Sequence, residues 1–189
     1  SNELNRTIYC ENDANCFAFN ELIPEGFTPN FGGNIADTSL TIGTKGEFKD
    51  GFADGVLYDL SGSVGRSESQ YVIYNTLNAS LGPTTPRDFR PGKYIQLEKN
   101  FNFDLVKLVD AGLYEDVNLA GGLEWHEESY EVVAGDVASY TAGPLTSQGF
   151  GIGSNGFPGF KPNDAGVSTR RNIAAYVDVE SQVTEALLL

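Results

Sequence analysis

The single histidine of the chain lies between two carboxylates at a spacing that could serve metal binding or acid–base chemistry. Glu124, His126 and Glu128 alternate along one segment, so on a β-strand their side chains would share one face. Imidazole and carboxylate groups bind zinc and transfer protons. Same-face neighbours on a strand lie about 6–7 Å apart, however, and no further ligand is fixed nearby. We therefore interpret the row as part of a polar wall, with no metal and no catalytic residue.

The sequence also lacks the motifs that identify common enzyme classes. It contains no glycine-rich phosphate loop and no nucleophile elbow, and no arrangement pairs its histidine with a serine or cysteine nucleophile. The sequence therefore predicts a protein that is not an enzyme and holds no cofactor.

A glycine-rich stretch between Gly149 and Gly159 contains the candidate contacts to a solute. Its glycines permit backbone conformations that other residues avoid. The aromatic residues in and near it are Tyr140, Phe150, Phe157 and Phe160. Their ring faces could bury the apolar C–H surface of sugars. Alternatively, the rings pack the loop on itself.

The two cysteines, Cys10 and Cys16, lie in a polar segment before the first expected strand. In an oxidising compartment they would form a disulfide that closes a small loop. Two free thiols in a reducing compartment are the alternative. Metal binding is disfavoured because the chain has one histidine and no second cysteine pair.

The charge balance argues against nucleic acid as a partner. The chain has 26 acidic and 12 basic residues, a net charge of −14, and its lysines and arginines are scattered. No apolar run approaches the roughly 20 residues of a membrane helix, so any membrane contact must come through strands. The absence of methionine and the apolar run at 186–189 predict a piece of a longer protein.

Five segments alternate apolar and polar residues with the period of two that is typical of β-strands. In the fourth segment, Leu119, Leu123 and Trp125 share one face, whereas Glu124 and His126 share the other. The predicted strands cover residues 38–48, 56–65, 100–110, 117–133 and 171–183. We therefore expect an all-β fold, an antiparallel meander of long strands.

Two architectures explain such two-faced strands: two sheets packed face to face in water, or a barrel with its apolar face toward lipid. All five segments reach the roughly 9–11 residues of a membrane-crossing strand. The connections 49–55 and 111–116 are short and contain Gly with Asp, whereas 66–99 and 133–171 are long. Short turns at one end and long loops at the other are typical of outer-membrane barrels.

Aromatic residues near the expected strand ends support the barrel interpretation. Tyr71, Tyr74, Tyr114 and Trp125 could occupy the two membrane interfaces, where amphipathic rings are favoured. The alternative is that they form the core of a sandwich.

Five stretches carry a family resemblance. They are NTLNASLGPT at 75–84, GLEWHEESYEV at 122–132, AGD at 134–136 with the following Ser139 and Tyr140, FPGF at 157–160, and RNIAAYVDVE at 171–180. In order and spacing they resemble the barrel portion of TonB-dependent outer-membrane receptors of Gram-negative bacteria. The resemblance covers roughly residues 38–187.

The resemblance implies a part of an outer-membrane β-barrel. Residues 38–189 would form the partial barrel and residues 1–37 an N-terminal extracellular-loop segment. The parent protein would take up a solute, an oligosaccharide or a siderophore-like chelate. Its partners would be outer-membrane lipid and the rest of the barrel and plug. Five strands cannot close a barrel, so we expect the excised piece to self-associate through its strand edges.

Two hypotheses of other classes stand beside this one. The first is a soluble extracellular β-sandwich that binds carbohydrate, in which the apolar faces would meet each other. The second is an enzyme on a β scaffold, which would need an acid–base constellation that the sequence does not display.

Overall fold

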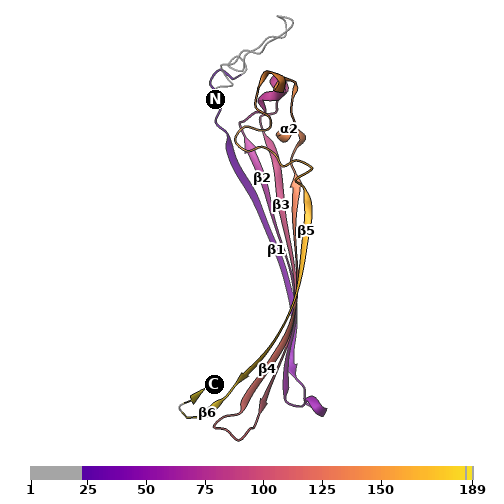
Figure 1. Cartoon of the computed structure of the whole chain (residues 1–189), viewed down its shortest axis with the longest axis vertical. Coiled ribbons are helices and arrows are strands. Elements are labelled where there is room, and N and C mark those ends of the chain that lie inside the picture. Colours follow the sequence, from indigo (N-terminus) through magenta and orange to yellow (C-terminus); the bar gives the residue numbers. More distant parts are fainter. Residues whose placement is uncertain (1–22, 186, 189) are drawn as a thin grey trace, which may run out of the picture. The chain divides into compact units, whose positions relative to one another are not determined.

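The computed structural model describes residues 23–185 and 187–188 and consists mainly of one antiparallel sheet. Its strands are β1 (Asn30–Glu47), β2 (Val56–Tyr74), β3 (Phe89–Val109), β4 (Val117–Ala134) and β5 (Gly166–Glu180). They pair in chain order, β1-β2-β3-β4-β5 (Figure 1). A separate antiparallel pair follows, β6 (Gln182–Thr184) with β7 (Leu187–Leu188). The predicted all-β meander is therefore confirmed.

The strands are longer than the predicted ones, and the two long loops are correspondingly shorter. β2 continues past Gly65 to Tyr74, and β3 begins at Phe89 rather than at Asn100. The sequence prediction stopped where the apolar alternation stopped, because residues 66–70 are Arg-Ser-Glu-Ser-Gln. Backbone pairing continues through this polar stretch, since ladder hydrogen bonds need no apolar side chains.

The bounds of the two outer strands also differ from the prediction. β1 begins at Asn30, inside the segment 1–37 that was expected to be a loop. β5 covers Gly166–Glu180 instead of 171–183, and Ser181 separates it from β6. The actual loops between β2 and β3 and between β4 and β5 are residues 75–88 and 135–165.

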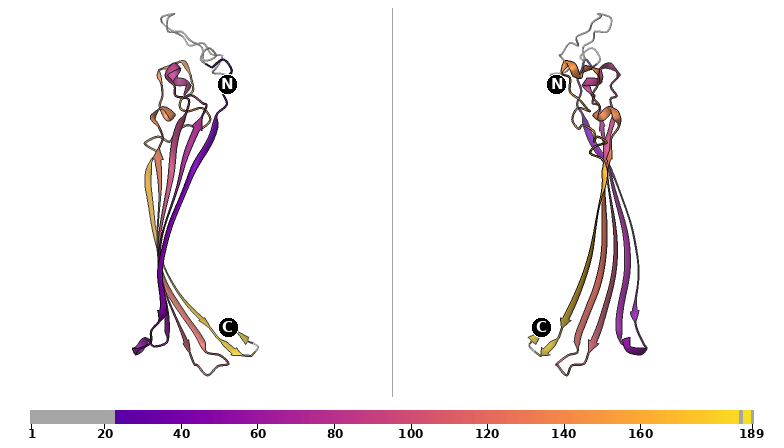
Figure 2. Two further views of the ribbon diagram at one scale, coloured as in Figure 1. Left: turned by 180° about the vertical axis from the view of Figure 1, so that it is seen from behind. Right: turned by 45° about the vertical axis from the view of Figure 1, so that its right-hand side comes forward.

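The described residues form two units, which the five strands run through. Unit 1 comprises 23–36, Ser67–Ile95 and Tyr130–Val167, so it holds both long loops. Unit 2 comprises Asp37–Arg66, Gln96–Ser129 and 168–188 without residue 186, so it holds both short turns. Figure 2 shows the five strands side by side in two further views.

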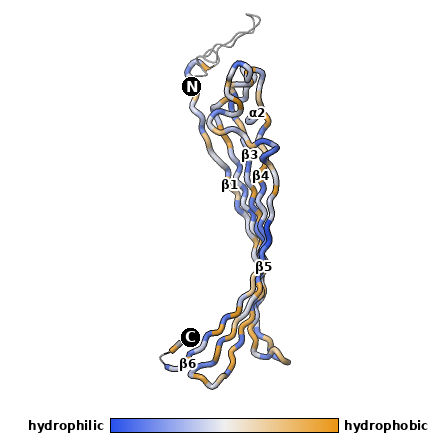
Figure 3. Tube along the Cα trace, viewed as in Figure 1, coloured by the Kyte–Doolittle hydropathy of each residue, from blue (hydrophilic) through white to orange (hydrophobic). Residues whose placement is uncertain are grey.

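Unit 2 has almost no buried side chains. Among its described residues only Ser181 is buried, whereas Ile173 is 80% and Val177 84% exposed. Hydrophobic and hydrophilic residues alternate along its strands (Figure 3). We call the side that carries Leu40, Ile42, Val64, Phe101, Leu119, Leu123, Trp125, Ile173 and Val177 the apolar face, and the other side the polar face.

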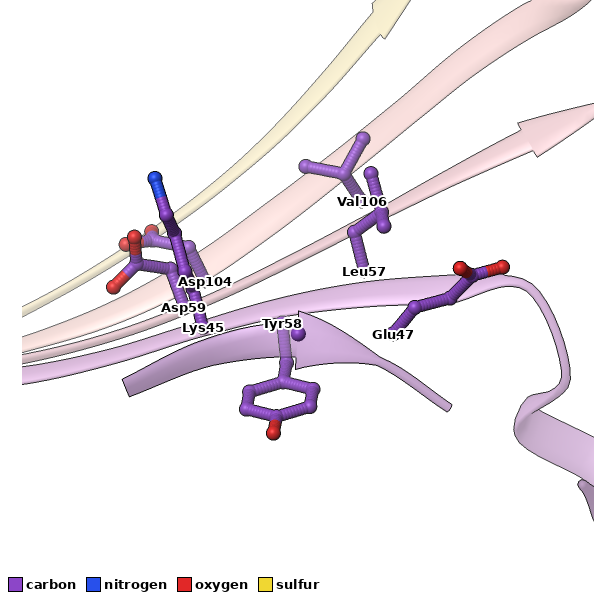
Figure 4. A pocket seen from close by; sticks show the side chains of 8 residues that line it. Lys45, Glu47, Leu57, Tyr58, Asp59, Asp104 and Val106 are labelled. Carbon is purple, nitrogen blue, oxygen red and sulfur yellow. The ribbon is translucent and has the colours of Figure 1, made fainter. Parts of the chain in front are cut away.

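Figure 4 shows side chains on the two sides of the sheet in unit 2. Lys45, Asp59 and Asp104, from β1, β2 and β3, project to one side together with the apolar Leu57 and Val106, and Tyr58 projects to the opposite side. The three charged residues line the polar face of unit 2. Tyr58 and Asp59 are adjacent on β2 and project to opposite sides of the sheet, as the pleat of a strand requires.

The short connections are built as the sequence predicted, from glycine and aspartate. The first contains the 3-10 helix η2 (Gly51–Ala53). In the second, the Gly112 amide donates to Asp110 Oδ1 at 2.9 Å, and Gly112 has φ of 68°. That backbone conformation favours glycine, and the aspartate side chain closes the turn.

Unit 1 holds the buried core, and its loops contribute most of it. Ile73 and Phe89 lie at the strand ends, and Leu77, Ala79 and Phe150 come from the two loops. The loops contain three short helical segments, η3 (Ala79–Thr84), α2 (Val137–Tyr140) and η4 (Pro144–Gln148). Among the described residues, no helix has the length and apolar character needed to cross a membrane.

Candidate functional site

Six aromatic rings form a continuous cluster in unit 1. Four come from adjacent strands, and the loop between β4 and β5 supplies the other two. The strand residues are Phe31 on β1, Tyr71 on β2, Tyr94 on β3 and Tyr130 on β4, and the loop residues are Phe157 and Phe160. We call this set the aromatic cluster.

The rings of the cluster contact one another in sequence from strand to strand. Tyr130 stacks on Tyr94 with centroids 5.4 Å apart, and Phe160 lies 5.0 Å from Tyr94. At the other end, Phe31 lies 5.5 Å from Tyr71 and 4.8 Å from Phe157. Such offset and edge arrangements stabilise each pair by about 0.5–1.5 kcal/mol beyond the area they bury. Phe31 and Tyr130, at the two ends, remain exposed.

Backbone hydrogen bonds fix the loop against the strands that flank the cluster. The Phe160 amide donates to the Pro91 carbonyl at 2.8 Å, and the Gly135 amide donates to the Phe160 carbonyl at 3.1 Å. A Cβ on Gly92 would lie 2.3 Å from Phe160 Cδ2, so only glycine leaves room for the ring there. The Phe160 ring therefore occupies a defined position over β3.

A buried amide joins the two long loops. Asn78 Nδ2 donates to the carbonyls of Ala138 at 2.8 Å and Thr141 at 2.9 Å, and its Oδ1 accepts from the backbone and side chain of Ser80. The side chain is fully buried. A fully bonded amide inside a protein holds its partners in one arrangement, because each lost bond leaves a polar group without water.

The four predicted solute contacts fall into different environments. Phe157 and Phe160 belong to the aromatic cluster. Phe150 is 3% exposed and packs with Leu77 and Ala79, so its ring fills the loop core and is enclosed away from solvent. Tyr140 is half-buried at the end of α2 and lies outside the cluster. The predicted cysteine pair, Cys10 and Cys16, lies outside the described residues.

Four members of the cluster were missed as contacts by the sequence prediction. Phe31 and Tyr94 were assigned no role, Tyr130 was noted only as part of the stretch 122–132 that carries the family resemblance, and Tyr71 was assigned to a membrane interface. Phe31, Tyr71 and Tyr94 lie in the strand extensions outside the predicted ranges, whereas Tyr130 lies within the predicted strand 117–133. The available signal was an aromatic residue near one end of each of β1 to β4.

The electrostatics of the cluster favour the neutral form of one hydroxyl group, that of Tyr130. Partial desolvation, with Tyr94 and Tyr71 close by, raises the pKa of the Tyr130 hydroxyl. The Tyr130 hydroxyl is therefore held in its neutral form beside the other two tyrosines. Apolar ring faces with hydroxyl groups at their rim suit a solute that has both C–H surface and polar substituents.

The histidine row lies in unit 2 and makes polar contacts. His126 Nε2 lies 3.4 Å from Glu128 Oε2, and Arg170 Nε lies 2.9 Å from Glu128 Oε1. Glu128 is thus held by an arginine as well as by the histidine. Within residues 23–185, no three His, Cys, Asp or Glu side chains gather in a way that could hold a metal ion.

Comparison with known proteins adds no family to this description. No protein-family model, no curated protein and no solved structure matches the chain.

Proposed function

We propose that the chain forms part of the wall of a TonB-dependent outer-membrane receptor, whose complete barrel takes up a solute across the outer membrane. The observation that carries this proposal is the apolar face of unit 2. It extends over five adjacent strands, and the described residues supply nothing that covers it. Receptor membership itself rests on the resemblance of the sequence.

The length of the apolar face supports contact with a bilayer. On β4 it runs from Val117 to Trp125, and on β3 from Phe101 to Val109 with Lys107 interposed. Nine strand residues extend about 26 Å, or about 20 Å along the membrane normal at the usual tilt of a barrel strand. The apolar band of outer-membrane barrels is about 25 Å tall.

The edges of the sheet support incorporation into a larger barrel. β1 and β5 each pair with one neighbour only, and every residue of β5 is exposed. Backbone groups along an open edge cannot be left unpaired in hydrocarbon, since each would cost several kcal/mol. The smallest bacterial barrels have about eight strands. Further strands, and the plug of the family, would therefore be the partners of this sheet.

The aromatic cluster supports the choice of solute class. It lies in the unit that contains the long loops, which in outer-membrane barrels face the outside of the cell. Its exposed rings, Phe31 and Tyr130, could stack on sugar rings or on the flat groups of a chelate. We propose an oligosaccharide or a siderophore-like chelate as the solute.

The sandwich alternative requires a second sheet, and the described residues do not provide one of sufficient size. Its apolar faces would have to be covered by a second sheet. Besides the main sheet, the described residues provide only the short pair β6 and β7.

Fluorescence quenching of the only tryptophan tests the membrane assignment. Trp125 lies on the apolar face, and the adjacent His126 lies on the polar face. In vesicles with brominated acyl chains, we expect strong quenching of Trp125. The matched variant carries Trp125→Phe with His126→Trp and should be quenched much less. Equal quenching at both positions would contradict the proposal. So would a Trp125 side chain that is shielded from water in the absence of lipid.

A further inference from the structure

A row of charged side chains borders the apolar face of unit 2 at one end. Lys99 on β3 directly precedes Phe101 on that face, Glu127 on β4 follows Trp125, and Arg171 on β5 precedes Ile173. Lys99 Nζ lies 2.8 Å from Glu127 Oε1, and Arg171 Nε donates to Glu127 Oε2. These contacts place the three side chains on one face, and we call them the basic triad.

The triad is built so that its cations point outward. The Glu127 side chain is 13% exposed, whereas those of Lys99 and Arg171 are 46% and 70% exposed. Lys99 and Arg171 donate hydrogen bonds to the two different oxygens of the Glu127 carboxylate. One carboxylate thus orients two cations and leaves the group with a net positive charge.

Both cations keep donors for another ligand. A guanidinium has five N–H groups and an ammonium has three. Arg171 uses its Nε–H on Glu127, and Lys99 makes one bond to the same carboxylate. Among the described residues these two cations have no other hydrogen-bond partner. The remaining N–H groups suit phosphate oxygens, which arginine binds through its planar fork.

Charge is separated between the two faces of unit 2. By strand alternation, the charged residues on the apolar side of β1 to β5 are Arg66, Lys99, Lys107, Glu127 and Arg171. The polar side carries Asp37, Lys45, Glu47, Asp59, Glu98, Asp104, Glu124, Glu128, Arg170, Asp178 and Glu180. A chain of net charge −14 therefore places mostly cations on the face that borders the apolar residues.

We propose that Lys99 and Arg171, oriented by Glu127, bind the phosphate of a lipid headgroup whose acyl chains lie on the apolar face beside Trp125. This inference rests on the proposed membrane contact and adds a headgroup preference to it. Charge complementarity carries it, since cations at a membrane surface attract anionic headgroups and can form pockets for them. A sheet adapted only for contact with hydrocarbon would not need cations in preference to anions on its apolar side.

The test uses the same tryptophan, because Trp125 is the nearest apolar neighbour of Glu127 on its face of β4. The chain is placed in phosphatidylcholine vesicles that contain brominated phosphatidic acid, brominated phosphatidylcholine or a brominated fatty acid. We expect the fraction of brominated lipid needed for a given quenching of Trp125 to be about fivefold lower for phosphatidic acid than for phosphatidylcholine. The reason is that roughly one net cation of the basic triad faces the headgroup. The fatty acid, an anion without phosphate, should show a smaller preference.

Two adjacent arginines provide matched variants. Arg171→Gln removes a cation of the basic triad, and we expect the preference for phosphatidic acid to fall toward onefold. Arg170→Gln removes the neighbouring cation, which pairs with Glu128 on the polar face, and should leave the preference unchanged. Circular dichroism of each variant in vesicles verifies that the sheet is retained. A preference that survives with Lys99→Gln and Arg171→Gln combined would overturn the inference.

Other outcomes separate the two proposals. If no brominated lipid quenches Trp125, the membrane assignment itself fails. If phosphatidic acid and phosphatidylcholine quench equally, the membrane assignment stands and the headgroup site fails. If the fatty acid matches phosphatidic acid, the face recognises negative charge alone, and the phosphate assignment is overturned.

Discussion

Single buried side chains determine how the two long loops of unit 1 pack together. Asn78 illustrates this, because one amide bonds Ala138 and Thr141 in the other loop and Ser80 in its own. The sequence shows an Asn-Ala-Ser tripeptide there, which looks like a surface feature. The structure instead places this asparagine where two loops meet, and no local pattern could have indicated that.

Replacing Asn78 with aspartate should loosen both loops. The change removes two amide donors and directs a carboxylate oxygen at two carbonyls in a buried site. We expect a loss of local stability of about 3–5 kcal/mol. Amide hydrogen exchange in residues 75–88 and 135–165 measures it. Asn163→Asp, at an exposed loop position, should leave exchange unchanged; unaltered exchange in Asn78→Asp would show that the amide does not join the loops.

Two phenylalanines of the same loop should respond differently to truncation. Phe150→Ala opens a cavity among Leu77 and Ala79, so we expect a local loss of about 3–5 kcal/mol, measured as faster exchange across both loops. Phe157→Ala removes a ring at the partly exposed cluster and should cost clearly less. Equal destabilisation by both variants would contradict the separation of packing residues from surface residues.

For the main sheet, the sequence predicted the number, order and direction of the strands, and the structure confirms all three. Lengths were wrong because periodicity detects only the part of a strand whose faces differ in polarity. Beyond Gly65, β2 carries polar residues on both sides, and its pairing depends on neighbouring strands. Three members of the aromatic cluster, Phe31, Tyr71 and Tyr94, were missed as contacts for the same reason, since they belong to parts of β1, β2 and β3 outside the predicted strands.

Gly122 on β4 leaves room for a hydrogen bond between side chains of the two strands that flank β4. Tyr176 Oη on β5 donates to Asp104 Oδ1 on β3 at 2.8 Å, and this bond passes over Gly122. A Cβ at Gly122 would lie 2.2 Å from Asp104 Oδ1 and 2.4 Å from Tyr176 Cε1. Gly122→Ala should therefore displace the tyrosine and destabilise the sheet by about 1–3 kcal/mol.

The neighbouring glycine is the control for that prediction. A Cβ at Gly121 would meet only the Tyr176 carbonyl oxygen, at 3.4 Å, which is an ordinary contact. Gly121→Ala should thus be neutral, or slightly stabilising because alanine has less freedom in the unfolded chain. Urea unfolding in detergent, followed by Trp125 fluorescence, measures both variants. Similar midpoints for the two would show that the tyrosine does not depend on the space above Gly122.

At the scale of the whole molecule, the sheet has two faces of opposite character and two open edges. The faces determine which surroundings it can tolerate, and the edges determine what it must pair with. β1 is exposed along nearly its whole length and β5 along all of it, so neither is protected by another element among the described residues. Long unprotected edges pair with any available strand.

We therefore expect isolated copies of the chain to associate edge to edge. Light scattering after size exclusion should give a mass above 20.4 kDa in mild detergent and larger assemblies without it. A charged residue on an edge strand opposes such pairing, so Ala174→Lys on β5 should lower the assembled fraction several-fold. Ala120→Lys on the interior strand β4 adds the same charge away from an edge and should not. A stable monomer of the unaltered chain without detergent would argue that the sheet does not need further strands, and with it against its place in a larger barrel.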